Sequence, residues 1–141
     1  MIRYFDASAL VKRYVEEDHS REVARLLSAS TAVTCRLSES EIASALARRH
    51  REGSLPLAAR NRLLAAMRHD VDSLYVVEIS PEVSAAAVRI LMRHRLRAGD
   101  ALQLASALTL AGRSDLEIQF VSFDQSLNEA ASREGLALFG S

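Results

Sequence analysis

The sequence predicts a three-layer α/β/α fold, in which helices cover both faces of a central, mostly parallel sheet of five strands. Short apolar runs alternate with longer segments of helical periodicity, which is the pattern of repeated strand–helix–strand units. Only 5 glycines and 2 prolines interrupt the 141 residues, and no repeat or Pro/Gly-rich linker divides them. We therefore expect a single domain over residues 1–141.

Five short apolar segments are expected to be strands. The first, Ile2–Phe5, stops at an aspartate, and the second, Thr31–Cys35, is rich in β-branched and small residues. The other three are residues 74–79, 118–121 and 136–138. Because right-handed crossovers place the carboxyl ends of parallel strands at one edge of a sheet, a functional crevice is expected at that edge.

Helical periodicity fills the segments between the strands. The expected helices cover residues 7–14, 20–27, 38–52, 56–68, 81–95, 100–110 and 124–134. Ser80 followed by Pro81 suits the start of the fifth helix. Gly53, Gly112 and Gly135 follow the expected ends of three others, where glycine often stops a helix.

Composition excludes several classes of protein. With 49% hydrophobic and 26% charged residues, the chain is not a disordered one. Lys plus Arg and Asp plus Glu each number 18, so net charge predicts no partner. The single cysteine, Cys35, excludes an internal disulfide or a Cys-rich zinc site and fits a cytoplasmic protein. No apolar run approaches the roughly 18 residues of a membrane span, and the opening residues show no apolar h-region, so neither a span nor a signal peptide is expected.

Four acidic residues occupy strand ends or helix starts. Asp6 directly follows the first strand, and Glu41 lies in the first turn of the helix after the second strand. Asp100 opens an apolar helix, and Asp124 comes three residues after the end of the fourth strand. Each has a purely structural interpretation as a helix cap or a partner of the helix dipole, and Ser38 with Glu41 matches the S-x-x-E capping box.

Taken together, the four acids favour a metal site. Two like charges about 4 Å apart cost about 4 kcal/mol at an effective dielectric of 20, whereas a helix dipole returns only about 0.3–1 kcal/mol. A divalent cation removes this conflict, and an all-oxygen ligand set suits Mg²⁺ or Mn²⁺. Ser8 and Ser122 lie within two residues of an acid, so their hydroxyls are candidates to contact the ion's water or a phosphate. Gln103, one helical turn after Asp100, could face the same crevice.

Arginines are concentrated in two segments of this neutral chain. Residues 48–68 contain six arginines and one acid, and residues 89–97 contain four arginines and no acid. Such clusters are typical of a surface for a polyanion, although solvated helix faces produce the same pattern. Arg97, three residues before Asp100, is the best placed to meet a substrate phosphate near the metal. With 5% aromatic residues and no Trp, contacts to backbone phosphates are favoured over base stacking.

These acidic segments resemble those of a known family. Residues 4–12 (YFDASALVK) look like the opening of PIN domains, in particular VapC-like toxins of type II toxin–antitoxin pairs. Residues 41–46 (EIASAL), 99–107 (GDALQLASA) and 121–124 (VSFD) are similar to the other acidic blocks of that family, in the same order.

The resemblance implies a Mg²⁺- or Mn²⁺-dependent endoribonuclease with Asp6, Glu41, Asp100 and Asp124 at the metal site. Ser8 and Ser122 match the family's Ser/Thr positions. The resemblance also implies a homodimer and a cognate antitoxin whose C-terminal segment occupies the crevice.

The expected reaction is attack of water, activated by the ion, on an RNA phosphodiester. Asp6, Glu41 and Asp100 would fix the metal, and Asp124 would hold a second ion or orient the water. The sequence does not choose between one ion and two.

An interaction module of another kind stays open, in which the acids only cap helices and the arginine faces bind a partner protein. Nucleotide-binding glycine motifs are absent from the sequence. A phosphoacceptor domain would need an acid at the end of the third strand, where Ile79 and Ser80 stand. A phosphatase with an aspartate nucleophile would need a second carboxylate close to Asp6.

Overall fold

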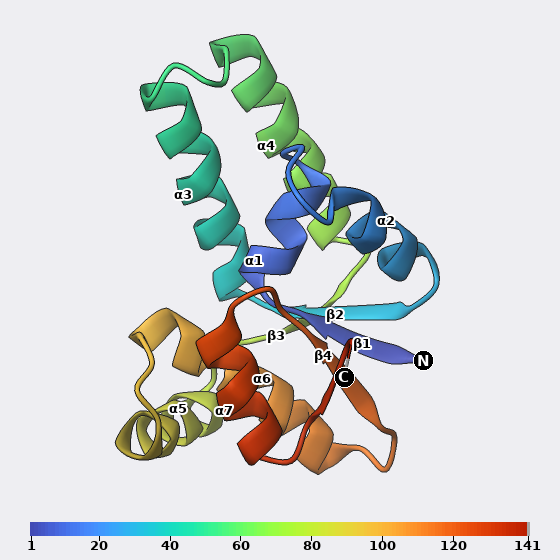
Figure 1. The fold of residues 1–141 in the computed structure, drawn as a ribbon, viewed down its shortest axis with the longest axis vertical. Helices are drawn as coiled ribbons and strands as arrows, with labels where there is room; N and C mark the ends of the chain where they lie inside the picture. Colours follow the sequence, from blue (N-terminus) through green and yellow to red (C-terminus); the bar gives the residue numbers. More distant parts are fainter. Residues whose placement is uncertain (141) are drawn as a thin grey trace.

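The computed structural model describes residues 1–140, which form a five-stranded, fully parallel sheet with helices on both faces (Figure 1). The strand order is β3-β2-β1-β4-β5, and every neighbouring pair is parallel. The strands are β1 (Ile2–Phe5), β2 (Thr31–Cys35), β3 (Tyr75–Val77), β4 (Ile118–Val121) and β5 (Ala137–Leu138). The predicted three-layer α/β/α architecture is therefore confirmed.

The helices divide into two layers. On one face lie α1 (Ala7–Leu10), the 3₁₀ helix η1 (Val11–Arg13), α2 (Ser20–Ser28), α3 (Leu37–Arg51) and α4 (Leu57–Val71). On the other face lie α5 (Pro81–Arg93), α6 (Ala98–Arg113) and α7 (Gln125–Arg133). Within residues 1–140, none of these helices combines the length and apolar character needed to cross a bilayer.

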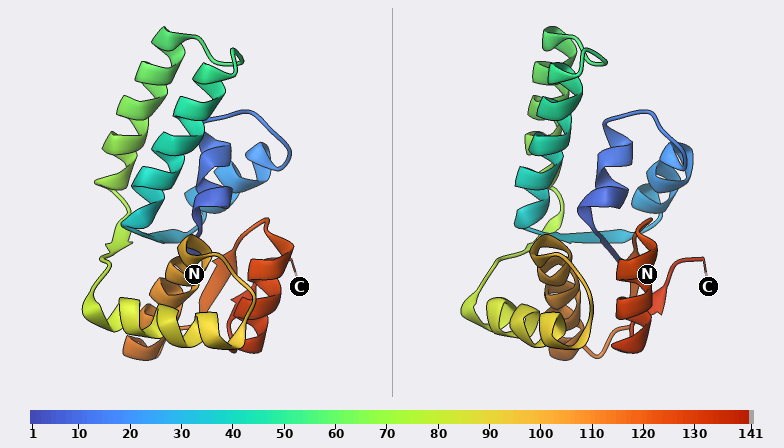
Figure 2. Two further views of the ribbon diagram at one scale, coloured as in Figure 1. Left: turned by 90° about the vertical axis from the view of Figure 1, so that its left-hand side faces the viewer. Right: turned by 60° about the vertical axis from the view of Figure 1, so that its left-hand side comes forward.

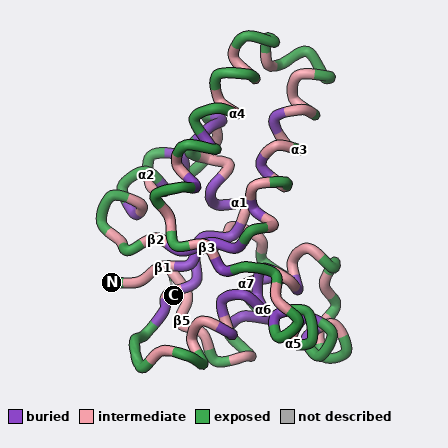
Figure 3. The backbone as a smooth tube through the Cα atoms, turned by 180° about the vertical axis from the view of Figure 1, so that it is seen from behind, coloured by how far each residue is buried: buried purple, intermediate pink, exposed green. Residues whose placement is uncertain are grey.

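The central strand, β1, separates two hydrophobic cores. Tyr4 belongs to the core under α5, α6 and α7, where its ring stacks on Phe120 at 5.6 Å between centroids. Phe5 belongs to the core under α1, α3 and α4. Buried segments accordingly concentrate along the sheet and the helix faces turned toward it (Figure 3). Because β1 is buried on both sides, the residue at its carboxyl end is held in a fixed position.

Helices α3 and α4 form an antiparallel hairpin that projects away from the sheet, and we call it the α3–α4 arm (Figure 2). Its turn passes through Gly53 at φ +84°, a left-handed conformation that glycine adopts without steric cost. The two helices of the arm carry all six arginines of the 48–68 segment.

Local differences from the sequence predictions have identifiable causes. The prediction of a capping box at Ser38 is wrong, because α3 begins at Leu37. The Ser38 hydroxyl is instead fully buried and hydrogen-bonded to Thr34 and Gln103. Gly112 does not end α6, which continues to Arg113 and stops where Ser114 turns to extended backbone. The third strand is shorter than expected, and the first helix tightens into a 3₁₀ turn after one α-helical turn.

Candidate functional site

A cavity of about 580 Å³ lies at the edge of the sheet where β1 and β4 end. Its lining comes from segments far apart in the sequence: the β1–α1 junction, the loop before α2, α3, the start of α6 and the loop after β4. All four predicted acids contribute to it, namely Asp6, Glu41, Asp100 and Asp124. The structure thus brings these carboxylates to one space.

Asp6 is the most deeply buried of the four acids, with 3% of its surface exposed. Its Oδ1 accepts the Ala9 N–H at 2.9 Å, which caps α1. The Ser8 hydroxyl donates to Oδ1 at 2.8 Å, and the Ser122 hydroxyl donates to Oδ2 at 2.8 Å. Burial raises the pKa of Asp6 to about 6 against these hydrogen bonds, and the charge of Asp100 adds to the rise.

Asp100 lies in the first turn of α6 and is partly buried. Its pKa is raised first by burial, then by the negative charges of Asp124 and Glu41, and the positive charge of Arg97 opposes the rise. Within residues 1–140, no hydrogen bond or ion pair holds the Asp100 carboxylate. The effect of Asp124 and Glu41 on the pKa of Asp100 indicates that their charges act on the same space.

Asp124 caps α7 by accepting the Leu127 N–H on Oδ1 at 2.9 Å. The cap interpretation therefore holds for Asp6 and Asp124, which nevertheless line the cavity. Asp100 is not a cap, since Arg97 occupies that position of α6.

Glu41 is held by a buried polar network that starts at Gln103. The Gln103 Nε2 donates to Glu41 Oε1 at 2.9 Å and to the Ser38 hydroxyl at 3.1 Å, while its Oε1 accepts the Tyr4 hydroxyl at 2.7 Å. The Thr34 hydroxyl lies 2.6 Å from that of Ser38 and donates to the Phe5 carbonyl at 2.7 Å. The sequence analysis placed Gln103 near the crevice, where it lies, but it missed Tyr4 and Thr34 and assigned Ser38 to a capping box.

The three predicted substrate-binding residues are placed differently. Ser8 and Arg97 line the cavity, whereas Ser122 is not among the lining residues. The Ser122 hydroxyl donates to Asp6 and accepts the Asp124 N–H at 3.1 Å. Its position therefore suits holding two acids in place rather than meeting a substrate.

Basic residues also line the cavity, and we call them together its basic wall. They are Lys12, Arg48, Arg49 and Arg97. Only part of each arginine cluster seen in the sequence therefore lines the cavity, and the other arginines of both clusters lie outside it. Lys12, which the sequence analysis did not single out, joins this wall from η1.

The donor chemistry of the cavity fits a hard divalent cation. Four carboxylates and the Ser8 hydroxyl offer oxygen only, and burial, followed by the negative charges of neighbouring acids, raises the pKa of both Asp6 and Asp100. In the part of the chain that the structure describes, no three His, Cys, Asp or Glu side chains are gathered closely enough to form a ready ligand cluster. Binding an ion would therefore require some of these side chains to turn further inward.

The family is decided by a sequence match that covers most of the chain. A model of the PIN domain family matches residues 3–132, a range that includes all four acids. The chain belongs to the PIN domain family. Curated protein sequences gave no match to this PIN domain.

Solved structures resemble this PIN domain over nearly its whole length. They include FitAcB from Neisseria gonorrhoeae, with 16% identity, a TM-score of 0.72 and coverage of 99% of this chain and 97% of that chain. VapBC2 from Rickettsia felis bound to a promoter DNA fragment has 11% identity, a TM-score of 0.68 and coverage of 98% and 97%. A toxin–antitoxin complex from Klebsiella pneumoniae has 15% identity, a TM-score of 0.65 and coverage of 88% of each chain. At such identities the likeness concerns the fold.

Proposed function

We propose that this PIN domain is a divalent-metal-dependent endoribonuclease. The observation that carries the proposal is the convergence of four carboxylates, from four separate segments, on one cavity that also has a basic wall. Hydrolysis of a phosphodiester with a metal ion requires carboxylates around one space to hold the ion and nearby cations to hold the phosphate. RNA is proposed as the substrate from the family resemblance of the four acidic segments.

Mg²⁺ or Mn²⁺ would be held by Asp6, Asp100 and Glu41, with Asp124 as a further ligand or as a group that orients water. When bound, such an ion supplies positive charge and activates water for attack on phosphorus. The protein's own contributions are positional. Ser8 and Ser122 fix Asp6, Gln103 fixes Glu41, and Arg97 provides a cation beside Asp100.

We also propose that the protein is the toxin of a toxin–antitoxin pair. Among the similar structures, one is described as a toxin–antitoxin complex, and VapBC2 is described as bound to a DNA fragment from its promoter. A cognate antitoxin, a homodimeric assembly and a cytoplasmic location follow from the same proposal. A buried free cysteine, Cys35, is compatible with a reducing compartment.

The test combines metal binding with RNA cleavage. Asp100→Asn should remove Mn²⁺ binding measured by calorimetry and reduce Mn²⁺-dependent cleavage of a long single-stranded RNA by at least about 100-fold. Asp115→Asn, which changes an exposed aspartate outside the cavity, is the matched control and should behave like the wild type. Undiminished cleavage by Asp100→Asn would refute the assignment.

A second candidate is a non-catalytic module that binds a partner protein. The helix caps made by Asp6 and Asp124 favour it, as does the lack of a ready ligand cluster among residues 1–140. This module would give no Mn²⁺ heat that depends on Asp100. The calorimetric arm therefore separates the two candidates without reference to activity.

A further inference from the structure

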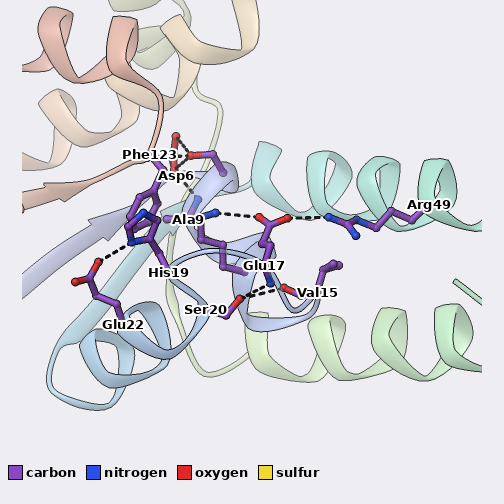
Figure 4. Close-up of polar contacts among 11 residues, drawn as sticks. Asp6, Ala9, Val15, Glu17, His19, Ser20, Glu22, Arg49 and Phe123 are labelled. Atoms are coloured by element: carbon purple, nitrogen blue, oxygen red, sulfur yellow. Dashed lines mark hydrogen bonds and ion pairs between the residues drawn. The ribbon is translucent and has the colours of Figure 1, made fainter. Parts of the chain in front are cut away.

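The basic wall of the cavity contains an anion held between two cations. Glu17 Oε1 accepts from Lys12 Nζ at 3.0 Å, and Glu17 Oε2 accepts from Arg49 Nη2 at 2.8 Å. Figure 4 shows Glu17 reaching the arginine on α3. All three side chains line the same cavity as the four acids. Each cation thus binds one oxygen of the same two-oxygen anion.

The Lys12 ammonium is fixed at this wall. Its side chain is only 11% exposed, and Nζ lies 5.0 Å from the centre of the Phe123 ring. The His19 ring stacks on Phe123 at 4.7 Å, which holds the aromatic ring in turn. A cation away from bulk water interacts more strongly with anions than one on an open surface. Lys12 is also the only lysine in the chain.

Glu17 is carried by a loop, whereas its two partners, Lys12 and Arg49, lie on helices. It lies in the loop between η1 and α2, with 29% of its side chain exposed. Its backbone is anchored, because its N–H donates to the Ser20 hydroxyl and that hydroxyl donates to the Val15 carbonyl. Rotation of the carboxylate toward solvent would leave these backbone contacts in place.

We infer that Lys12 and Arg49 form a subsite for an RNA phosphate next to the cleaved bond, and that Glu17 occupies this subsite in the free protein. A phosphodiester presents two non-bridging oxygens that share one negative charge, so it can replace a carboxylate between two cations. The exchange keeps both ion pairs and breaks no covalent bond. The inference rests on the proposed function, because it takes RNA to be the molecule in the cavity.

The inference has a specific consequence for affinity. Glu17 competes with the substrate, so its removal should tighten RNA binding, whereas a carboxylate that merely positioned Lys12 and Arg49 would weaken binding when removed. The sign of the change therefore distinguishes an internal competitor from a structural support.

The experiment measures binding of a fluorescein-labelled single-stranded RNA of about twelve nucleotides by fluorescence anisotropy in EDTA, where metal-dependent cleavage cannot proceed. Glu17→Gln should bind at least about 5-fold more tightly than the wild type, equivalent to about 1 kcal/mol. The matched control is Glu16→Gln, an exposed neighbour outside the cavity that changes the net charge equally, and it should stay within about 2-fold.

Two further variants test the cations directly. Lys12→Met and Arg49→Met should each weaken binding by about 5- to 10-fold, as expected for loss of one phosphate contact. Arg51→Met, an exposed arginine of α3 outside the cavity, is their control. Urea unfolding checks that each variant is folded. If Glu17→Gln is unfolded, Lys12→Met and Arg49→Met still test whether the two cations form a phosphate subsite.

Several results would overturn the inference. Affinity of Glu17→Gln equal to that of Glu16→Gln, or lower than that of the wild type, contradicts the role of Glu17 as a competitor. Affinity of Lys12→Met or Arg49→Met equal to that of Arg51→Met contradicts the subsite. Failure of the catalytic proposal looks different, since the wild type would then bind the RNA with this pattern yet leave it uncut in Mn²⁺.

Discussion

Asp6→Asn is expected to stabilise the metal-free protein at neutral and alkaline pH. Burial raises the pKa of Asp6 from 3.8 to about 6, so the folded protein binds this proton more tightly than the unfolded chain does. Below about pH 4 the group is protonated in both states and adds no penalty. As the pH rises from about 4 to above 6, the folded state loses stability relative to the unfolded state, and the loss is complete above the folded pKa.

The magnitude follows from the two pKa values. A rise from 3.8 to about 6 corresponds to about 3 kcal/mol for the ionised form. Asparagine has nearly the same shape, can keep the Ala9 N–H bond and can donate to a serine hydroxyl, so it retains the local geometry without the buried charge. The variant should therefore exceed the wild type in free energy of unfolding by about 3 kcal/mol at pH 8, and by only about 1 kcal/mol at pH 4.5.

Urea unfolding in EDTA at these two pH values measures the difference directly. Asp115→Asn, which removes an exposed aspartate, is the control and should show no comparable change with pH. Added Mn²⁺ should then raise the unfolding midpoint of the wild type but not that of Asp6→Asn, because only the native site binds the ion. A variant that is less stable than the wild type at pH 8, or a difference that does not shrink at pH 4.5, would refute the reasoning.

Three other substitutions test a polar network beside the site and two glycine positions of the fold. Gln103→Leu removes the partner of Glu41 and leaves buried polar groups unsatisfied, so it should cost about 2–4 kcal/mol of stability in urea unfolding and weaken Mn²⁺ binding in calorimetry. Gly53→Ala forces a side chain into φ +84° and should lower stability by about 1 kcal/mol. Gly112→Ala, inside α6 with nothing within 4 Å of the added methyl, should raise it by about 0.5–1 kcal/mol, and equal signs for the two glycines would contradict the helix assignment.

Much of the fold was predictable because local and long-range signals agree in this chain. The β1 and β4 boundaries follow directly from apolar runs that end at polar residues, and the parallel sheet follows from the alternation with helices. The capping box at Ser38 failed for a physical reason. The same serine that suits an exposed helix start is also small enough to be buried beside Thr34, and only the tertiary packing decides between the two.

The acids of the site, and Ser8, Ser122 and Gln103 near them, were accessible to sequence reasoning, whereas the hydrogen bonds that hold the acids were not. The carboxyl edge of a parallel sheet gathers the residues that follow its strands, so the sequence alone places Asp6 and Asp124 together. Gln103 reaches Glu41 and Tyr4 across elements separated by 62 and 99 residues, and no local pattern encodes such a network. The one-domain prediction for residues 1–141 and the roles of the site residues stay predictions.

The way in which Asp6 is held explains how one residue can be both a helix cap and a candidate metal ligand. Its hydrogen-bond donors are two serine hydroxyls and a backbone N–H, all of them uncharged. Neutral donors fix the position of the carboxylate but leave its charge uncompensated, which is why burial still raises its pKa. An arginine in their place would stabilise the free protein and neutralise the charge that attracts a cation. The stability that the folded protein loses when Asp6 ionises is therefore what a bound divalent ion would restore. This connects the unfolding measurement to the proposed metal site.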